Sequence, residues 1–484
     1  MSDHTPILVG IAHVEQREQD PALAAEPLAL MLQASERAAA DAGIALNQAS
    51  SIRVVRGMWP YSNPAAVLAE QIGRPDAETV ITQFGGNFVQ SCVNQTALDI
   101  QAGLHDLVLI TGAECGQTQA RAARKGQEPA WQAAPGTPDK VIGADKEMRH
   151  AVEQTVRIGR PIQVYPLFES AIRHHAGRSI EAHQTHISEL WSRFAAVAAH
   201  NPNAWIQEAK SAEEIRTPSE INRPVSSVYP KFMNSNNNVD QGAALIMCSV
   251  AKAEALGIPQ SQWIYPWAGT DGSDHNYVSN RDRLFESPAI RLAGQRCLEL
   301  AGLNATELDR VDVYSCFPSA VQVAAQELGL DIEAPLTVTG GLTWAGGPLN
   351  KYVMHSIVRM AELLRLAPDE KGLITANGGY LTKHAFGVYS ATAPTTPFRH
   401  ADLQAEIDAL TFRDVLPKHN GTETVESYSV MYGPEGLLKA FVTVVTAEGQ
   451  RAWGVTQDPD VLEDMTRHEY CGRAVNLADQ AANF

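Results

Sequence analysis

The order of predicted strands and helices in the first part of this chain occurs again in its second part. In residues 1–115, apolar runs of strand length alternate with stretches whose apolar residues recur at helical spacing. The same alternation resumes at residue 262 and continues to residue 393. Strands that alternate with helices predict βαβ units and a largely parallel sheet with helices on its faces. A duplicated βαβαβαββ unit therefore limits the core to two similar α/β halves.

A long polar segment separates the two halves. Residues 116–235 are rich in Arg, Gln and His, and their periodicity predicts helices at 167–178 and 183–200. A strand at 245–250 follows, and we assign residues 236–261 to the first half. An insertion of this length in an α/β core is usually functional. We expect it to form a helical loop domain.

The residues after 394 have a different pattern. Three short apolar runs, at 426–430, 438–445 and 451–455, are joined by turns that contain Gly. Short antiparallel strands with tight turns are typical of small barrels. We therefore expect residues 394–484 to form a separate all-β domain of OB-like type.

The composition excludes several classes of protein. The 484 residues are too many for one ordinary domain. Lys and Arg number 38 against 55 Asp and Glu, and the resulting net charge of -17 disfavours a nucleic-acid partner, because phosphates would be repelled. The six cysteines lack C-x-x-C spacing, so we expect neither a metal site nor disulfides. We find no signal peptide and no membrane span, which predicts a cytoplasmic protein.

Two glycine-rich segments lie late in the second half, GGLTWAGGP at 340–348 and ANGGY at 376–380. Three segments precede them in order, ITGAE at 110–114, VDQGAA at 239–244 and VDVYSCF at 311–317. On a duplicated α/β half, this set resembles the thiolase superfamily. The closer resemblance is to thiolase-like proteins of the sterol-carrier-type branch, which are commonly labelled acetyl-CoA acetyltransferase. Some of these end in an OB-like domain.

The resemblance implies a fold and a substrate class. It implies the five-layer αβαβα thiolase fold and an acyl-CoA thioester substrate in lipid metabolism, with coenzyme A as part of the substrate and no bound cofactor. Thiolases are usually dimers through the sheet edge of the first half. The resemblance therefore leaves open a homodimer, and an OB-fold partner protein is a further alternative.

The catalytic side chains of thiolases are replaced in this chain. By thiolase spacing, the nucleophilic cysteine falls at Gly86, whereas Cys92 lies further along a helix and is interpreted as a buried core residue. Gly347 stands at the position of the activating His, and Ala376 at that of the second Cys. Tyr314 takes the place of the Asn or His that holds an oxyanion-hole water. We therefore do not expect a covalent acyl-enzyme by the thiolase route.

Backbone groups survive such replacements. The resemblance places the N–H donors of a second oxyanion hole at Gly86 and Gly378, which would stabilise a thioester enolate. Our candidate catalytic side chains can transfer a proton; they are Tyr314, Tyr352, His355 and His384. Our candidate substrate contacts are Asn350, Lys383 and Arg173, the last of these for CoA phosphates. The plainer alternatives are a core or interface role for His355 and a sheet-edge role for Lys383 and His384.

Three functions remain open at this point. The first is an acyl-CoA enzyme, an acetyltransferase by resemblance, whose carbon–carbon chemistry would be of the non-covalent enolate type. The second is a retro-aldol lyase that acts on a β-hydroxyacyl-CoA. The third is a non-catalytic scaffold that binds acyl-CoA. The missing His and Cys residues favour the second and third on mechanistic grounds.

Overall fold

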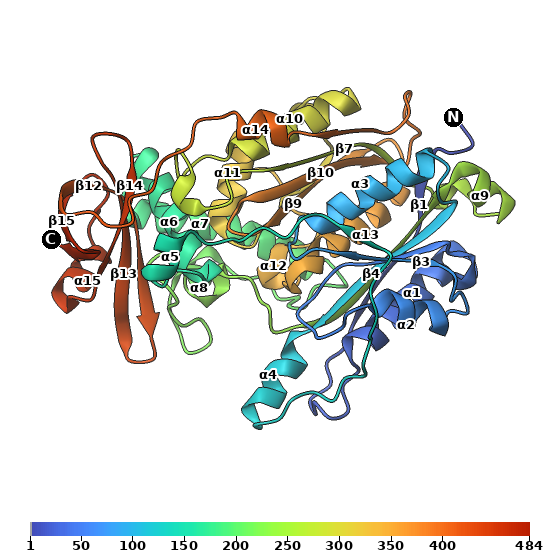
Figure 1. Cartoon of the computed structure of the whole chain (residues 1–484), viewed down its shortest axis with the longest axis horizontal. Coiled ribbons are helices and arrows are strands. Elements are labelled where there is room, and N and C mark those ends of the chain that lie inside the picture. The colour runs from blue at the N-terminus through green and yellow to red at the C-terminus, as the bar shows by residue number, and fades with distance from the viewer. Residues whose placement is uncertain (1) are drawn as a thin grey trace.

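The computed structural model describes residues 2–484, and its first half is built on a six-stranded sheet. The strands are β1 (Pro6–Glu15), β2 (Ser51–Val54), β3 (Glu78–Thr82), β4 (Leu107–Cys115), β5 (Lys140–Ile142) and β6 (Asp240–Ser249). Their order is β1-β6-β4-β2-β3-β5. Figure 1 labels β1, β3 and β4 of this sheet, with α1 and α2 beside it. β6 is antiparallel to both of its neighbours, whereas β2, β3 and β5 continue parallel to β4.

The second half repeats this arrangement. Its strands are β7 (Tyr265–Ser273), β8 (Arg310–Asp312), β9 (Lys371–Gly378), β10 (Lys383–Ser390) and β11 (Arg399–Asp402). The order β7-β10-β9-β8 matches β1-β6-β4-β2, and β10 is antiparallel to both neighbours as β6 is. The predicted duplication is confirmed.

Helices form three layers around the two sheets. The helices of the halves are α1 (Pro27–Ala42), α2 (Pro64–Gln71), α3 (Phe88–Gln101), α9 (Val250–Ala255), α10 (Pro288–Ala301), α11 (Pro318–Leu328), α12 (Gly341–Trp344) and α13 (Tyr352–Leu366). α3 and α13 contact both sheets and each other, so they form the central layer. α1 and α2 cover the outer face of the first sheet. α10 covers the outer face of the second sheet, and α11 packs against α10. The expected αβαβα layering is confirmed.

Local sequence explains where these helices begin and end. α1 buries Leu28, Met31 and Ala34 on one face and ends at Gly43, whose φ of 68° suits glycine. The sequence pattern did not predict α2, which is short and small-residue rich. The Asn63 side chain caps it by accepting a hydrogen bond from the Ala66 N–H.

The insertion supplies α4 (Gly116–Arg124), α5 (Ala151–Thr155), α6 (Pro161–His175), α7 (Ile180–Ala199) and α8 (Ala212–Arg216). α6 and α7 are the two helices that the periodicity predicts. Two strands lie outside the ranges expected for the core: β5 comes from the insertion and pairs with β3, and β11 follows residue 394 and pairs with β7. Both have four residues or fewer, too few to show a strand pattern.

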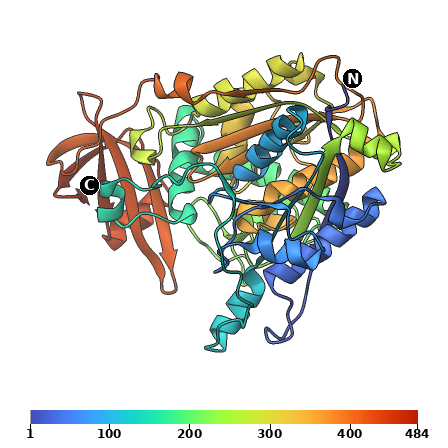
Figure 2. The same ribbon diagram turned by 45° about the vertical axis from the view of Figure 1, so that its right-hand side comes forward.

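The C-terminal strands close into a barrel, which confirms the expected all-β domain. After α14 (Gln404–Asp408) come β12 (Gly421–Gly433), β13 (Gly436–Val445), β14 (Arg451–Thr456), α15 (Pro459–Met465), β15 (Ala474–Ala478) and β16 (Ala481–Asn483). The barrel order is β12-β13-β14-β16-β15, around a small apolar core of its own. Figure 2 shows the barrel at one side of the α/β core, with α6 packed against β12.

Buried polar contacts join the barrel to the rest of the chain. The Arg451 guanidinium is fully buried and donates to the Glu426 carboxylate and, at 2.7 Å, to the Ser279 carbonyl. The Trp453 indole donates to the Ser279 hydroxyl at 2.9 Å. In the described range 2–484, no helix combines the length and apolar character that a membrane crossing needs.

Candidate functional site

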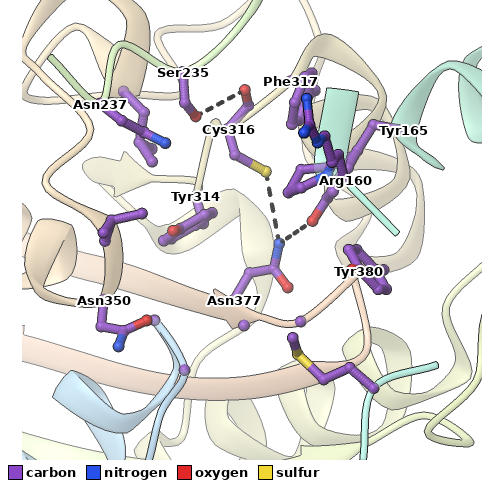
Figure 3. A pocket seen from close by; sticks show the side chains of 18 of the residues that line it. Arg160, Tyr165, Ser235, Asn237, Tyr314, Cys316, Phe317, Asn350, Asn377 and Tyr380 are labelled. Carbon is purple, nitrogen blue, oxygen red and sulfur yellow. Dashed lines mark hydrogen bonds between the residues drawn. The ribbon is translucent and has the colours of Figure 1, made fainter. Parts of the chain in front are cut away.

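A cavity of about 480 Å³ lies between the two halves and the insertion (Figure 3). Three helices begin at it: Gly86 precedes α3, Pro161 opens α6, and Phe317 is the N-cap of α11. Helix N-termini present unpaired N–H groups and partial positive charge. Among the described residues that line the cavity, Arg160 is the only charged one. The cavity is therefore suited to a ligand with a polarised carbonyl or an anionic group.

The position predicted for a nucleophile is closed. A Cβ on Gly86 would fall 3.0 Å from the Tyr314 hydroxyl and closer still to the Asn377 carbonyl oxygen. A cysteine side chain has no room there. The Gly86 nitrogen lies 3.1 Å from the point where a Cβ on Gly378 would stand. The structure thus brings together the two backbone segments that the sequence suggests for an oxyanion hole.

Tyr314 presents its hydroxyl to this cavity. Its backbone N–H donates to the Thr375 hydroxyl at 2.9 Å, and its ring packs edge-on against Tyr352, with centroids 5.6 Å apart. Its own hydroxyl forms no hydrogen bond with any residue in the described range. Burial raises the pKa of Tyr314 well above its usual range. The phenol is therefore a proton donor at neutral pH.

Three residues that the sequence reasoning did not select form a network beside Tyr314. The Asn377 side-chain amide donates to the Tyr165 hydroxyl at 3.1 Å and lies 3.8 Å from the Cys316 sulfur (Figure 3). The Leu381 N–H also donates to the Tyr165 hydroxyl, at 3.0 Å. Burial raises the pKa of Cys316 to about 12, so this thiol stays protonated. Like Tyr314, it can donate a proton but is a poor nucleophile.

The sequence held a signal for two of these three residues. Cys316 lies in VDVYSCF, two positions after Tyr314, and Asn377 lies in ANGGY. Tyr165 comes from the insertion, and no motif marks it. Its contacts with Asn377 and the Leu381 N–H arise from the tertiary fold, which brings the first half of α6 against the end of β9 and the turn that follows it.

Two further side chains define the cavity wall. Asn350, a predicted substrate contact, is buried and donates to the Arg56 carbonyl at 2.7 Å, which ties the second half to the first. Arg160 is exposed, and its guanidinium has no ion-pair partner in residues 2–484. Of the predicted residues, the structure thus brings Gly86, Tyr314, Asn350 and Gly378 to one cavity.

Tyr352 and His355 lie behind the cavity rather than in it. The hydroxyls of Tyr352 and Thr339 are hydrogen-bonded at 2.6 Å, so the Tyr352 phenol is already engaged. The His355 Nε2 lies 2.5 Å from the Lys351 amine, and its ring packs edge-on against His13 at 4.1 Å. Burial lowers the pKa values of all three of these bases. This buried cluster supports the plainer, structural interpretation of His355.

His384 and Lys383 face a different cavity, of about 270 Å³, between α3 and the second sheet. The His384 Nε2 lies 3.5 Å from the Asp274 carboxylate, which also accepts from the Ser287 hydroxyl at 2.5 Å. The Lys383 amine donates to the Phe84 carbonyl at 3.3 Å, and burial lowers its pKa. Neither side chain lines the main cavity. They support the start of β10, as the sheet-edge alternative suggests.

Arg173 does not reach the main cavity, which corrects the expectation that it contacts CoA. It is buried under the barrel, where it donates to both carboxylate oxygens of Glu469, each at 3.0 Å, and to the Tyr428 hydroxyl at 2.9 Å. α6 carries its C-terminal half away from the cavity and toward β12, so a residue this far along it meets the barrel.

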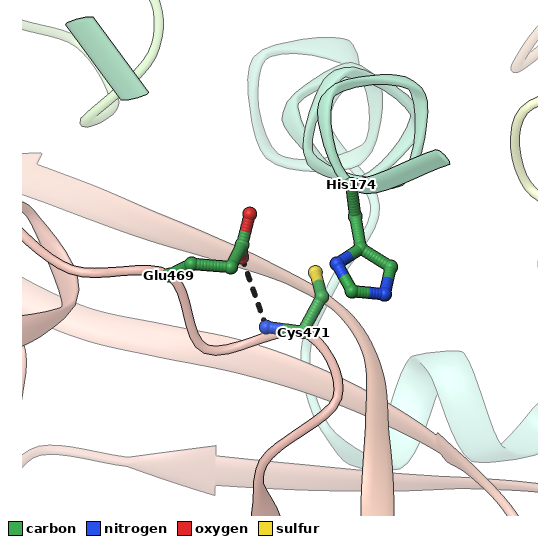
Figure 4. Close-up of side chains that lie close together, drawn as sticks. All are labelled: His174, Glu469 and Cys471. Carbon is green, nitrogen blue, oxygen red and sulfur yellow. Dashed lines mark hydrogen bonds between the residues drawn. The ribbon is translucent and has the colours of Figure 1, made fainter. Parts of the chain in front are cut away.

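A group of metal-ligand type surrounds this ion pair. His174, Glu469 and Cys471 bring a nitrogen, an oxygen and a sulfur within 4.8 Å of one another (Figure 4). Arg173 holds both oxygens of Glu469, however, and burial raises the pKa of Cys471, which disfavours the thiolate that metals bind. We interpret the group as part of the contact between α6 and the barrel.

Comparison with known proteins agrees with these features. A family described as "Thiolase-like protein type 1 additional C-terminal domain" matches residues 402–480, the region of the barrel. An acetyl-CoA acetyltransferase of Pseudomonas aeruginosa is 29% identical over 149 residues, which are 29% of this chain and 34% of that protein. One from Methanocaldococcus jannaschii is 20% identical over 270 residues, 55% of this chain and 60% of that protein. The matches thus span about a third to 60% of these relatives.

Solved structures extend the likeness to the whole chain. The crystal structure of a monomeric SCP2-thiolase like protein type 1 from Mycobacterium smegmatis has a TM-score of 0.84 and 29% identity, and it covers 100% of this chain and 99% of that one. A structure titled "Ltp2-ChsH2(DUF35) aldolase" has a TM-score of 0.61 and 19% identity, with 81% of this chain and 98% of that chain covered. At this identity the second match speaks for the fold alone.

Proposed function

This chain belongs to the thiolase superfamily, and we propose that it binds an acyl-CoA thioester in the main cavity and promotes carbon–carbon bond chemistry through a non-covalent enolate. Coenzyme A enters as part of the substrate, and no resident cofactor takes part. The proposal includes a cytoplasmic place in lipid metabolism.

The observation that carries the proposal is the packing at Gly86. A cysteine does not fit at this position, because the Asn377 carbonyl and the Tyr314 hydroxyl occupy the space. The thiolase route through an acyl-enzyme at this position is therefore closed. The backbone at Gly86 and Gly378 keeps the close approach that a pair of N–H donors to a thioester oxygen requires. This supports polarisation of the thioester without covalent attachment.

Proton transfer in this cavity has a defined direction. The lining contains no carboxylate and no imidazole among the residues that the structure describes. Tyr314 and Cys316 are both protonated at neutral pH, because burial raises both pKa values. They are therefore suited to give a proton to an enolate carbon. The exposed Arg160, beside the N-terminus of α6, is suited to the anionic part of CoA.

A retro-aldol lyase is the second candidate, and Tyr314 favours it. The Cα–Cβ bond of a β-hydroxyacyl-CoA breaks, which releases a carbonyl compound and leaves a thioester enolate. The β-hydroxyl proton passes to the Tyr314 oxygen in the same step in which the Tyr314 proton passes to the α-carbon. A single tyrosine therefore balances both transfers, and it ends the reaction protonated as it began. The fold-level likeness to a structure titled as an aldolase is in keeping with this candidate. That title names two proteins, and the OB-fold partner protein that the sequence resemblance left open belongs to this version of the proposal.

The test combines binding with turnover. Calorimetry with CoA, acetyl-CoA and a long-chain acyl-CoA measures affinity, and mass spectrometry of the same mixtures detects cleaved or condensed products. We expect binding, and no protein mass increase from an acyl-enzyme. Arg160→Met should weaken binding about tenfold, whereas Arg216→Met, a matched arginine that does not line the cavity, should not.

Each outcome separates the candidates. Product formation that Tyr314→Phe lowers about 100-fold supports the enolate chemistry. A β-hydroxyacyl-CoA as the sole cleaved substrate selects the lyase. Binding without turnover leaves the scaffold as the function. An absence of binding to every CoA compound rejects the proposal.

A further inference from the structure

A second cavity, of about 330 Å³, lies at the opposite ends of two helices that line the main one. Pro161 of α6 and the N-cap residue Phe317 of α11 line the main cavity. His175 of α6 and Gln322 of α11, further along the same helices, line the second. Its volume lies in the range of small-molecule sites. The residues that line the main cavity and those that line this one are entirely different, so the two are separate sites.

One wall of the second cavity is apolar and aromatic. The rings of Phe285 and His175 stack at a centroid distance of 4.0 Å and an interplanar angle of 11°. Ile172, Leu330 and Ile332 extend this wall. Such a surface is suited to the flat or aliphatic body of a small ligand.

Arg178 supplies an unpaired positive charge. It is half-buried, and its guanidinium forms no ion pair and no side-chain hydrogen bond with residues 2–484. A guanidinium removed from bulk water favours a carboxylate, which it can bind through two parallel hydrogen bonds. Asp331 is the one acidic residue among the described lining residues, and it is exposed, with one carboxylate oxygen already accepting the Glu333 N–H.

Gln322 supplies a buried acceptor without a donor. The residue is 8% exposed, and its side-chain nitrogen donates to the Glu169 carboxylate at 2.7 Å. Its Oε1 has no hydrogen-bond partner. The amide cannot be turned over to change this, because Oε1 would then face the Glu169 carboxylate. His183 holds the same carboxylate at 2.5 Å, so the arrangement is fixed. A buried acceptor of this kind requires an O–H or N–H donor.

We propose that this cavity binds a small carboxylic acid with an apolar body and a hydroxyl group. The carboxylate pairs with Arg178, the body lies on the wall that contains Phe285, and the hydroxyl donates to Gln322 Oε1. Each of the three features that the cavity leaves unmatched receives a complementary group. The proposal does not depend on acyl-CoA binding in the main cavity.

The probe is 4-hydroxyphenylacetate, and saturation-transfer NMR measures its binding to the full chain. We expect saturation transfer with a Kd in the millimolar range or tighter, about −4 kcal/mol or better. Phenylacetate lacks the hydroxyl and 4-hydroxyphenylethanol lacks the carboxylate, and each should bind at least about fivefold more weakly. Arg178→Met should weaken the probe about tenfold. Arg216→Met, a half-buried arginine elsewhere in the insertion, is the matched control.

Three results would overturn the proposal. The first is no saturation transfer at about 10 mM probe, a concentration at which even weak sites are occupied. The second is equal affinity in wild type and Arg178→Met. The third is competition by acetyl-CoA together with weaker binding in Arg160→Met, which would assign the probe to the main cavity. Because Arg178 makes no side-chain bond, its replacement leaves the fold intact, and a normal melting curve verifies this.

Discussion

The carbonyl oxygen of Asn377 occupies the space that any side chain on Gly86 would need. The Tyr314 hydroxyl lies 3.0 Å from the same point, so the second half of the chain closes the position from two directions. The nucleophile site has therefore not merely lost its sulfur. The packing around Gly86 requires a glycine. The backbones at Gly86 and Gly378 still lie close together, as an oxyanion hole requires.

Gly86→Cys should not create a thiolase. We expect it to destabilise the fold by about 1–3 kcal/mol, because the new Cβ meets backbone atoms that cannot move freely. We also expect no acetyl adduct on incubation with acetyl-CoA. Urea unfolding and intact-protein mass spectrometry measure the two effects.

Gly433→Cys is the matched control for this substitution. Its Cβ would meet nothing closer than Leu438 at 3.6 Å, an ordinary contact, so the change in stability should stay within about 0.5 kcal/mol. An acetyl adduct on Gly86→Cys at wild-type stability would show that the position still accepts a nucleophile.

The two neighbouring tyrosines should respond oppositely to loss of their hydroxyls. Tyr314→Phe removes a hydroxyl that bonds to no described residue, so we expect stability within about 0.5 kcal/mol of wild type and a fall in turnover of about 100-fold. Tyr352→Phe removes buried hydrogen bonds with the Thr339 hydroxyl, at 2.6 Å, and the Asp312 carboxylate, at 3.4 Å, and should cost about 1–2 kcal/mol. Chemical denaturation and the product assay separate the effects. Equal turnover in wild type and Tyr314→Phe would remove Tyr314 from the mechanism.

The Cys316 thiol should resist alkylation at neutral pH although it lines a cavity. Burial raises its pKa from 9.0 to about 12, so its thiolate fraction between pH 7 and 9 is about two to three orders of magnitude below that of an unfolded thiol. The raised pKa means that the neutral thiol stabilises the fold below pH 9, and this contribution is lost as the pH rises toward 12. Iodoacetamide labelling followed by peptide mass spectrometry reports the rate. Rapid labelling at pH 8 would reveal an activated thiol instead.

The ion pair between Arg173 and Glu469 should hold the barrel in place. Arg173→Ala leaves a half-buried carboxylate without its partner, and we expect a loss of about 2–4 kcal/mol. Arg467→Ala removes an exposed pair with Glu463 and should change stability by less than about 0.5 kcal/mol. Limited proteolysis should cleave the segment at 409–420, which joins α14 to the first barrel strand β12, faster in Arg173→Ala only. Equal cleavage of both variants would assign the barrel contact to other residues.

The chain should be monomeric, in contrast to the homodimer that the thiolase resemblance left open. β5 pairs with β3 along the edge of the first sheet, so β3 has no free edge for a second copy. β5 itself has three residues and begins with Lys140, features that disfavour edge pairing. Light scattering after size exclusion should give a mass near 52.4 kDa at micromolar concentration. A mass near twice this value would show that another surface forms a dimer.

Much of the fold was predictable because periodicity reports burial. The strand 106–111 and the helix 87–103 carry continuous and helical apolar patterns, and both appear as β4 and α3 within a few residues. β5 and β11 were not predicted, because a strand of three or four residues has too few positions to show alternation of apolar and polar residues. Their pairing is decided by tertiary contact, which no local window contains.

The candidate site was only partly predictable, for a related reason. Thiolase spacing indicated Gly86, and the second glycine-rich segment indicated Gly378, since a close approach of two backbones leaves glycines in the sequence. His355 and His384 carry groups suited to catalysis, but they lie on sides of their elements that point away from the main cavity. Arg173 does not reach the main cavity because it lies in the C-terminal half of α6, which packs against β12 of the barrel. Tyr165 entered from an insertion with no motif, so only the folded chain reveals it.

The absence of carboxylates from the described lining of the main cavity has a kinetic consequence. The chain as a whole carries a charge of -17, so a polyanion such as CoA meets repulsion on approach and attraction only near Arg160 and the three helix N-termini. At low ionic strength the repulsion extends about 30 Å, and at physiological ionic strength about 8 Å. Added salt would then first accelerate the encounter, the reverse of enzymes that steer their ligands from afar. Differences in affinity between ligands would then arise from their dissociation rates rather than from their association rates.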